Sequence, residues 1–314
     1  MHTPVLLKEV IEYLKPEPGD IILDATIDGG GHAEAIMQKI GKTGTLIGID
    51  QDAVILENLK SQIPARRCYA SSVAGGSNLK NNVILINGNF RNLDELLKNN
   101  NIEKIDGAIF DLGTSMLQLE ESGRGFTFQK NEPLLMTYKS DINSTDLIAQ
   151  DIVNKWSEKD ITDILYKYGE ERFSRRIAKN IVDIRERKEI KTTFDLSEII
   201  RLSVPSFYRN NQRLNCCTKT FQALRIAVND ELNAIEEGLS KVWKLLSAES
   251  RLVVISFHSL EDRIVKNFFK EKSKKEELLI LTKKPIIPSQ EEIISNSSSR
   301  SAKLRAIEKY GKGN

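Results

Sequence analysis

The stretch Asp24-Ala25-Thr26-Ile27-Asp28-Gly29-Gly30-Gly31-His32 decides the fold of this chain. The apolar run 21–23 leads into it, a helix-forming segment at 33–40 follows it, and a second apolar run at 45–49 ends in Asp50. The pattern predicts a strand, a glycine turn, a helix and a second strand, with an acid at each strand end. Glycines let a ligand approach the backbone, and an acid at the second strand end accepts hydrogen bonds from ribose hydroxyls. The stretch therefore predicts a site for a nucleoside-bearing cofactor, and hence an enzyme.

The spacing of the glycines narrows the choice of cofactor. Gly29-Gly30-Gly31 lacks the G-x-G-x-x-G spacing of a dinucleotide site, so it offers less of a cradle for a pyrophosphate. S-adenosylmethionine carries a ribose and an adenine but no phosphate, and needs only close backbone approach and the acid. The turn therefore favours a methyltransferase over an NAD-dependent enzyme, while a merely flexible turn is a third interpretation.

The composition is that of a soluble globular protein. The 314 residues can bury one large core or two modest ones, and no apolar run approaches the roughly 20 residues needed to span a bilayer. The N-terminus lacks the basic and apolar regions of an export signal. The 3 cysteines, Cys68, Cys216 and Cys217, include no C-x-x-C pair, which predicts reduced thiols in the cytoplasm and no structural zinc or other metal site.

Strand and helix signals keep alternating after Asp50. We expect a helix at 53–63, a polar surface loop at 66–82, and strands at 83–86 and 107–111. This alternation predicts an α/β fold, in which helices cover a parallel sheet and a binding crevice lies at the carboxyl ends of the strands. Asp24, Asp50, Phe90 and Asp111 all lie at or just past such ends, so we expect them to share one site.

The pattern changes between Thr114 and Asn215, where amphipathic helical spacing replaces the strand signals. Apolar residues from Phe221 to Leu246 then predict one long helix, and the β-branched run 251–257 returns to the sheet. We therefore expect a discontinuous core, residues 1–113 and 216–314, interrupted by a helical insertion at 114–215.

Basic residues gather in three stretches, 172–188, 263–275 and 300–312. Clustered cations can follow a phosphate backbone, but the acids among them also fit solvated helix faces, and charge alone does not choose between the two. Arg124-Gly125-Phe126 places a basic and an aromatic group around a glycine. That motif suits phosphate contact and base stacking, or else ordinary core packing.

Two further clusters carry chemistry. In Asp111-Leu112-Gly113-Thr114-Ser115, followed by Gln118, an acid stands at a strand end. Such an acid can accept a hydrogen bond from the N–H of an exocyclic amine, which localises the lone pair of the nitrogen and takes up developing positive charge. His258 follows the last predicted strand and is a second catalytic candidate, whereas Ser259 and Asp262 have the spacing of a helix capping box. Capping of a loop is the alternative role for Asp111.

Taken together, the motifs resemble the bacterial small-subunit ribosomal RNA cytosine-N4 methyltransferase family (RsmH, also called MraW). The resemblance runs nearly from end to end of the chain. It rests on the following segments: 2–9, the Gly-Gly-Gly-His turn, Gly48-Ile49-Asp50, Asn89-Phe90, Asp111-Leu112-Gly113, Arg124-Gly125-Phe126, 220–226, 256–266 and 299–305.

The resemblance implies a Rossmann-like methyltransferase sheet with an inserted helical domain that contacts RNA. It also implies methyl transfer from S-adenosylmethionine to the N4 amine of a cytidine in the decoding region of 16S ribosomal RNA, within an assembling small subunit. The cofactor contacts that it implies are Gly30, Gly31, His32, Asp50 on the ribose, Phe90 near the adenine, Asp111 and Gln118. A catalytic role for Asp111 or His258 is inferred from chemistry and position alone.

Some positions depart from the family pattern. Asp28 stands where a glycine is usual, and its side chain could crowd the cofactor turn. Leu135 and Thr137 replace a usual acid and arginine, and Cys216-Cys217 replaces a Pro-Ala pair. Two other functions therefore stay open: a degenerate relative that binds ribosomal RNA without transferring methyl groups, and an amine methyltransferase with another substrate. The sequence also leaves the oligomeric state open, a homodimer included.

Overall fold

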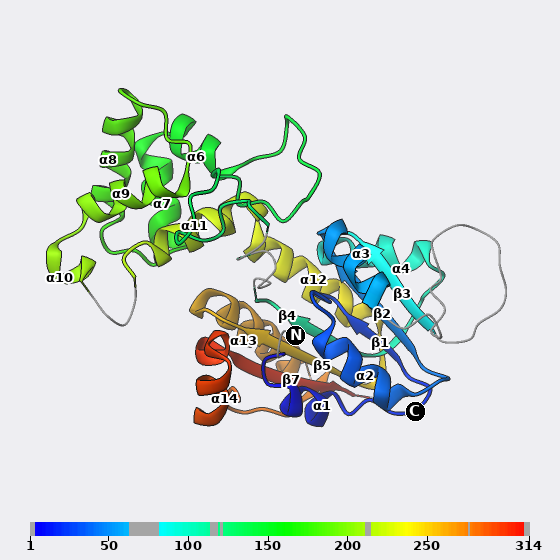
Figure 1. Cartoon of the computed structure of the whole chain (residues 1–314). Helices are drawn as coiled ribbons and strands as arrows, with labels where there is room; N and C mark the ends of the chain where they lie inside the picture. The colour runs from blue at the N-terminus through cyan, green and yellow to red at the C-terminus, as the bar shows by residue number, and fades with distance from the viewer. Residues whose placement is uncertain are drawn as a thin grey trace. The chain divides into compact units, whose positions relative to one another are not determined.

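The computed structural model describes residues 4–62, 82–113, 119, 122–210, 215–275 and 277–310. The chain forms two compact units (Figure 1). Unit 1 comprises Met1–Gly113 and Leu232–Asn314, and unit 2 comprises Thr114–Glu231. The first boundary coincides with the one expected from the sequence. The second lies after Glu231, whereas the sequence analysis returned to the core at residue 216.

Unit 1 is built on one seven-stranded sheet with the order β3-β2-β1-β4-β5-β7-β6. The first five strands in this order are mutually parallel. Their bounds are β1 Ile21–Asp24, β2 Thr45–Asp50, β3 Asn82–Asn87, β4 Ile105–Asp111 and β5 Leu246–Ser256. The predicted α/β fold is confirmed, because each short apolar run forms a central strand and each amphipathic segment between runs forms a crossover helix.

Helices cover both faces of this sheet. One face packs against α4 (Leu93–Asn99), α12 (Glu231–Leu245) and α13 (Ser259–Lys274), whose apolar side chains share a core with alternate strand residues. The other face carries α1 (Leu7–Leu14) and α2 (Gly31–Ile40). Helix α3 (Ala53–Gln62) follows β2, and the short helix η1 (Phe90–Asn92) follows β3. Burial on both faces explains why β1, β2 and β4 read as nearly continuous apolar runs.

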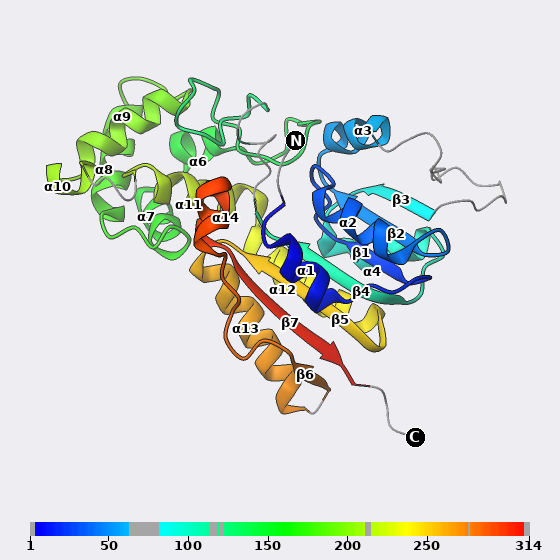
Figure 2. The ribbon, with the colours of Figure 1, turned by 60° about the horizontal axis from the view of Figure 1, so that its bottom comes forward.

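Two C-terminal strands were missed in the sequence. Strand β7 (Lys303–Lys309) pairs antiparallel with β5, and β6 (Leu278–Ile280) pairs antiparallel with β7, as Figure 2 shows. The sequence analysis assigned the residues of β7 only to the basic stretch 300–312. Its apolar members, Leu304, Ala306 and Ile307, are fully buried against the sheet. Helix α14 (Gln290–Ser295) and the short helix η2 (Ser297–Ser301) lie between β6 and β7 in the chain.

Unit 2 is helical in its described part. Its helices are α6 Ala149–Lys155, α7 Glu158–Lys167, α8 Ser174–Arg185, α9 Thr193–Ser203, α10 Ser206–Arg209 and α11 Thr218–Asn229. Polar residues start two of them: Ser157 accepts from the Asp160 N–H, and Thr192 forms a capping box with Asp195. The apolar faces meet in a core of their own.

The long helix expected from Phe221 to Leu246 is two helices. Asp230 has a φ of 49°, a left-handed conformation that ends α11 before α12 begins at Glu231. Helix α11 packs on α6 and α7, and for that reason it belongs to unit 2. Hydrophobic periodicity continues across the break, so the spacing alone gave no sign of it.

The two cysteines in the described residues, Cys216 and Cys217, are free and buried. Cys68 lies outside the described residues, as does most of the loop predicted at 66–82. No helix in the described ranges combines the length and the apolar character that a membrane span requires.

Candidate cofactor site

The carboxyl ends of the parallel strands bring three aspartates to one edge of the sheet. Asp24 ends β1, Asp50 ends β2 and Asp111 ends β4, and β1 lies between β2 and β4. Asp24 is paired in register with Gly48 on one side and Ile109 on the other. The structure therefore gathers three acids that the sequence places 26 and 61 residues apart along the chain.

Thr26 connects two of these strand ends. Its backbone N–H donates to Asp24 Oδ1 at 3.2 Å, and its Oγ1 accepts the backbone N–H of Asp111 at 2.7 Å. The Asp111 carboxylate accepts in turn from the N–H of Gly113 at 3.2 Å. The loops after β1 and β4 are thereby held against each other. The sequence analysis did not identify Thr26, whose only signal was a hydroxyl two residues after a strand-end acid.

Asp50 is held by the backbone on both oxygens. Oδ1 accepts from the Asp52 N–H at 2.8 Å, and Oδ2 accepts from the Asp28 N–H at 3.2 Å. The glycine turn therefore docks directly on the acid of the second strand. Asp52 itself accepts from the Val54 N–H and so caps the start of α3.

The electrostatics of Asp24 and Asp50 are unusual for aspartates. Burial above all, with repulsion from three neighbouring aspartates added, raises the pKa of Asp24 to about 8. Burial is also the main cause that raises the pKa of Asp50 to about 7, and Asp28 and Asp52 repel it. Neither Asp24 nor Asp50 forms an ion pair within the described part of the chain. Near pH 7, therefore, Asp24 is mainly protonated and Asp50 partly protonated, and a nearby cation would favour the ionised form of both.

The turn between β1 and α2 needs glycine at defined positions. Gly30 has a φ of 77°, and a Cβ there would lie 2.7 Å from Leu59 Cδ2. A Cβ at Gly31 would meet Pro4 at 3.0 Å. Beside Gly29, by contrast, no atom lies within 4 Å of the Cβ position, so the backbone of the turn borders open space there.

Asp28 explains one departure from the family pattern. It adopts a φ of 42°, in the left-handed region that glycine occupies at no steric cost and aspartate tolerates better than most residues. The acid therefore keeps the shape of the turn, and its N–H still reaches Asp50. The predicted crowding of the turn by its side chain stays a prediction.

His32 lies buried at the start of α2, with 7% of its surface exposed. Nε2 lies 2.9 Å from the backbone carbonyl of Val5, and Nδ1 lies 3.7 Å from Asp111 Oδ2. When Nε2 donates to the Val5 carbonyl, the Nδ1 of the neutral ring carries no proton and faces Asp111. Protonation of Nδ1 turns this contact into an ion pair. His32 therefore connects the N-terminal segment, the glycine turn and Asp111.

Phe90 stands at the end of β3 and is half-buried. Its ring meets Phe110 edge to face, with centroids 5.4 Å apart, and its Cδ2 would lie 2.7 Å from a Cβ on Gly238. The glycine in α12 thus makes room for the ring. Beside Phe90 the sequence analysis missed an amide pair: Asn89 Nδ2 donates to Gln51 Oε1 at 3.1 Å. Polar amides directly after two neighbouring strands were the available signal.

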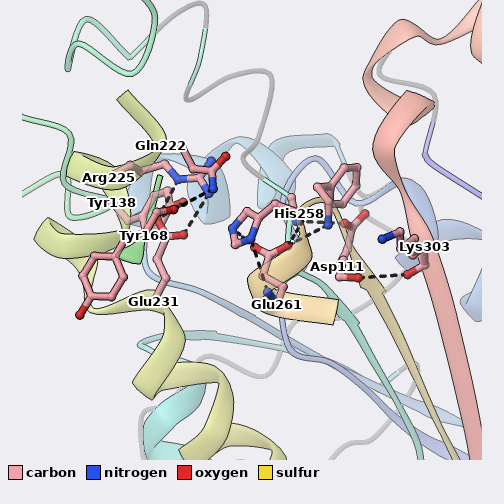
Figure 3. Close-up of polar contacts among 12 residues, drawn as sticks. Asp111, Tyr138, Tyr168, Gln222, Arg225, Glu231, His258, Glu261 and Lys303 are labelled. Carbon is pink, nitrogen blue, oxygen red and sulfur yellow. Dashed lines mark hydrogen bonds and ion pairs between the residues drawn. The ribbon is translucent and has the colours of Figure 1, made fainter. Parts of the chain in front are cut away.

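His258 caps α13. Its Nδ1 accepts from the Glu261 N–H at 3.4 Å, and its Nε2 lies 3.1 Å from Glu261 Oε1 (Figure 3). Glu261 Oε2 accepts from the N–H groups of Phe257 and His258, which completes the capping box. The predicted box of Ser259 and Asp262 is therefore wrong by one residue. Both ring nitrogens face Glu261, and a catalytic role for His258 stays a prediction.

Asp262 has another function in the structure. It forms a bidentate pair with Arg305 at 2.7 and 3.2 Å, which fastens α13 to β7. This partly buried ion pair therefore joins α13 to β7.

The motif Arg124-Gly125-Phe126 lies in unit 2 and is buried. Arg124 is 8% exposed and Phe126 is 7% exposed. The guanidinium donates to the Tyr138 carbonyl at 2.9 Å, and the Phe126 ring stacks on Tyr138 with centroids 5.4 Å apart. The structure favours the core alternative for this motif over phosphate contact and base stacking. Gln118, the remaining predicted cofactor residue, lies outside the described residues.

Comparisons with known proteins agree over nearly the whole chain. The sequence profile described as the MraW methylase family matches residues 1–310. A protein of Dictyoglomus thermophilum named ribosomal RNA small subunit methyltransferase H is 45% identical over 98% of this chain and 97% of its own length. Proteins of the same name from Thermotoga neapolitana and Caldicellulosiruptor bescii are each 44% identical, over 99% and 98% of this chain and 97% and 99% of their own lengths.

Proposed function

The chain belongs to the MraW methylase family, and from this premise we propose that it methylates the N4 amine of a cytidine in 16S ribosomal RNA with S-adenosylmethionine as donor. The relatives are named as methyltransferases of the small-subunit ribosomal RNA. The target base and the atom that is methylated are the finer part of the proposal, and they follow from the family resemblance of the motifs.

The observation that carries the proposal is the gathering of Asp24, Asp50 and Asp111 at one edge of the sheet, where the glycine turn docks on Asp50. A raised pKa in both carboxyls means that the site favours a cation that would keep them ionised. S-adenosylmethionine brings a sulfonium and an ammonium group, whereas NAD brings phosphates that these acids would repel. The residues present therefore fit this cofactor, and the glycine spacing fits it better than a dinucleotide.

Different residues of unit 1 bind different parts of S-adenosylmethionine. Asp50 accepts from the ribose hydroxyls with the lone pairs that its two backbone contacts leave, and the glycine turn at Gly29 and Gly30 lets the ligand approach the backbone. Phe90 lies against the adenine. Asp24, deeper in the sheet, supplies negative charge without direct contact.

Asp111 is the proposed catalytic residue. The bound donor supplies an electrophilic methyl group with a good leaving group, so the enzyme has to orient the amine and accept its proton. The N4 amine of cytosine is a poor nucleophile, because its lone pair is delocalised into the ring. The Asp111 carboxylate accepts a hydrogen bond from the N4–H, localises that lone pair, and receives the proton when the new N–C bond has formed and the S–C bond has broken. His32, 3.7 Å from Asp111, stabilises the orientation of the carboxylate.

The partner is 16S ribosomal RNA within the small subunit, and the place is the cytoplasm. One cytidine in a folded RNA is best selected by the shape around it, which favours an assembled or partly assembled subunit over free RNA. Unit 2 is the proposed RNA-contacting domain, because it adds a separate helical core to an already complete methyltransferase sheet.

The test is methyl transfer to small subunits purified from a strain that lacks the homologous enzyme. With labelled S-adenosylmethionine, we expect label in 16S RNA, and mass spectrometry of the digested RNA should locate it as N4-methylcytidine at one position. Subunits from the parent strain, already methylated, are the control. Binding of the donor without any transfer would favour the degenerate relative, and label on DNA or protein instead would favour another amine substrate.

A further inference from the structure

Unit 2 carries a cationic and aromatic surface that the proposed methyl transfer does not use. We define the α8–α10 surface as Arg172, Arg175, Arg176 and Lys179 on and just before α8, with Phe207 and Arg209 on α10. All six side chains belong to exposed residues, and Phe207 is 67% exposed. Figure 1 shows the two helices within unit 2.

The cations share one helix face. Spacings of three or four residues from Arg172 through Arg175 and Arg176 to Lys179 place them on one side of α8. No acid lies in the sequence between Arg172 and Lys179. Within the described ranges, none of these four cations lies within 4.0 Å of a carboxylate oxygen. Asp183 and Glu186 are exposed further along the chain, after the cationic group.

Two acids stand directly before this group in the chain: Glu170, which is exposed, and Glu171, which is buried and already hydrogen-bonded. Glu171 is fully buried, with Oε1 accepting from the Phe173 N–H at 2.8 Å and Oε2 accepting from the Tyr208 hydroxyl at 2.7 Å. Burial and these contacts raise the pKa of Tyr208 well above its usual range, so the phenol stays protonated and keeps donating. Glu171 therefore fixes α10 beside the start of α8, and its carboxylate is occupied by these two contacts and not by the surface cations.

Aromatic rings hold the first cation in place. The Arg172 guanidinium lies over the rings of Phe173, Tyr208 and Phe207, at 4.7, 4.7 and 5.2 Å from their centroids. The Arg172 head group is thus pre-oriented without being neutralised, and the exposed ring of Phe207 lies at the edge of the same group. Cations and an exposed ring side by side are what a single nucleic-acid strand requires, because phosphates contact the cations and an unstacked base covers the ring.

We propose that the α8–α10 surface binds an unpaired segment of the substrate RNA, with phosphates on Arg175, Arg176 and Lys179 and one base stacked on Phe207. This inference rests on the proposed function and names the surface of unit 2 that holds the substrate RNA. An acidic protein is the weaker match, because it would not use a lone aromatic ring pre-set beside an arginine. A duplex is also weaker, since its bases are stacked and out of reach of Phe207.

The main experiment compares two triple variants in the subunit methylation assay. Arg175→Glu, Arg176→Glu and Lys179→Glu reverse the proposed surface, and Arg172 is left intact because it packs on the rings. The matched control, Lys155→Glu, Lys159→Glu and Lys167→Glu, makes the same net charge change on exposed lysines of α6 and α7. Circular dichroism and thermal melting verify that both proteins fold.

We expect the α8 variant to raise the KM for subunits about 50-fold near 150 mM salt and to lower the slope of log KM against log salt by about 2. The kcat at saturating subunits and the Kd for S-adenosylmethionine should stay unchanged. The control should change KM no more than about threefold. An unchanged KM in the α8 variant, or an equal rise in both variants, would overturn the inference. If the wild-type protein itself methylates no subunits, the proposed function fails first, so the two failures are distinguishable.

A second arm tests stacking and the class of partner. Phe207→Ala should raise KM about tenfold, whereas Phe207→Trp should keep it near the wild-type value. A photo-crosslinking benzoylphenylalanine at position 207 should attach to 16S RNA in complexes with subunits, and the same residue at Tyr166 on α7 should not. A crosslink from position 207 to a ribosomal protein instead would show that the surface contacts protein and would contradict the proposal.

Discussion

The strand ends of unit 1 and the helix surface of unit 2 have opposite electrostatic designs. Unit 1 buries Asp24 and Asp50 without an ion pair in the described residues, and both carboxyls have raised pKa values. Unit 2 buries two acids, Glu171 and Glu231, with partners, and leaves the cations of the α8–α10 surface exposed. The strand ends of unit 1 suit the proposed cationic donor, and the α8–α10 surface of unit 2 suits the proposed polyanion, RNA.

The difference shows how two ligands of opposite charge can be handled by one chain. A buried charge acts strongly over a short range, because the surrounding dielectric is low. An exposed cluster acts weakly per charge, is screened by salt, and gains its strength from number. A cofactor site made of a few buried acids and a substrate surface made of many exposed cations are therefore expected to respond differently to mutation, salt and pH.

The largest effect should come from Asp50. Replacing it with alanine removes the two hydrogen bonds proposed to the ribose hydroxyls, together with the anchor of the Asp28 N–H. At about 1.5–3 kcal/mol for each hydrogen bond to a charged group, affinity for S-adenosylmethionine should fall about 1000-fold in isothermal titration calorimetry.

Asp52→Asn is the matched control for Asp50. It stands two residues away, and asparagine keeps the acceptor that caps α3 through the Val54 N–H. Its affinity should stay within about threefold of the wild type. If Asp50→Ala still binds the donor as tightly as this control does, the acid of β2 is not part of the site.

The next largest effect should be on the stability of unit 2, which we expect to depend on ion pairs to its buried acids. Arg225 holds Glu231 with two contacts of 2.8 and 3.0 Å, and Tyr138 donates a third at 3.1 Å (Figure 3). Arg225→Met leaves Glu231 buried without its cation, which should reduce the free energy of unfolding by about 3 kcal/mol in urea titrations.

The double variant Arg225→Met with Glu231→Gln sharpens that test. Removing both charges should restore most of the lost stability, because the cost lies in the unpaired charge more than in the missing contact. An unchanged stability of the single variant would mean that unit 2 tolerates an uncompensated acid as unit 1 does, and the comparison would fail.

Salt should separate the two regions in the wild-type protein. Three phosphate contacts on single-stranded RNA give a slope of about −2.1, so the KM for subunits should rise about 20-fold between 50 and 200 mM salt. The Kd for S-adenosylmethionine, set by buried acids, should change less than about twofold over the same range. Parallel salt dependences of KM and Kd would contradict the division between the two regions.

The smallest effect should be that of pH on cofactor binding. A cation favours the ionised carboxylates, so binding lowers the pKa values of Asp50 and Asp24 from about 7 and 8 and releases protons. Affinity for S-adenosylmethionine should therefore rise with pH, by at most about tenfold per pH unit for each proton released, and level off above about pH 8.

Two controls make the pH test specific. S-adenosylhomocysteine lacks the sulfonium charge and should show a weaker pH dependence, and Asp24→Asn should remove the upper part of the transition. Calorimetry in buffers of different ionisation enthalpy measures the protons released. A flat pH profile for the wild-type protein would mean that the acids are ionised before the donor binds.

Much of the sheet could be predicted, because its strands are short apolar runs that end in acids and alternate with helices. The strand at 45–49 and the strand at 107–111 each lie within one or two residues of β2 and β4. Strand β7 was missed because basic residues alternate with its apolar ones, which gave only a charge signal, and the fold alone places β7 between β5 and β6 and pairs Arg305 with Asp262. The break at Asp230 was missed because a single left-handed residue does not disturb hydrophobic spacing.

The sequence by itself determined the α/β class, the glycine turn and the acids at the ends of β1, β2 and β4, because each depends on neighbours within a few residues. Only the tertiary structure decided that Thr26 joins Asp24 to Asp111, that His258 caps a helix through Glu261, and that Arg172 lies over three rings. Thr26 and Asp111, and likewise Arg172 and Phe207, are far apart in the chain, and local periodicity carries no information about which distant partner a side chain meets. The His258 cap is local, but the spacing fitted Ser259 with Asp262 equally well.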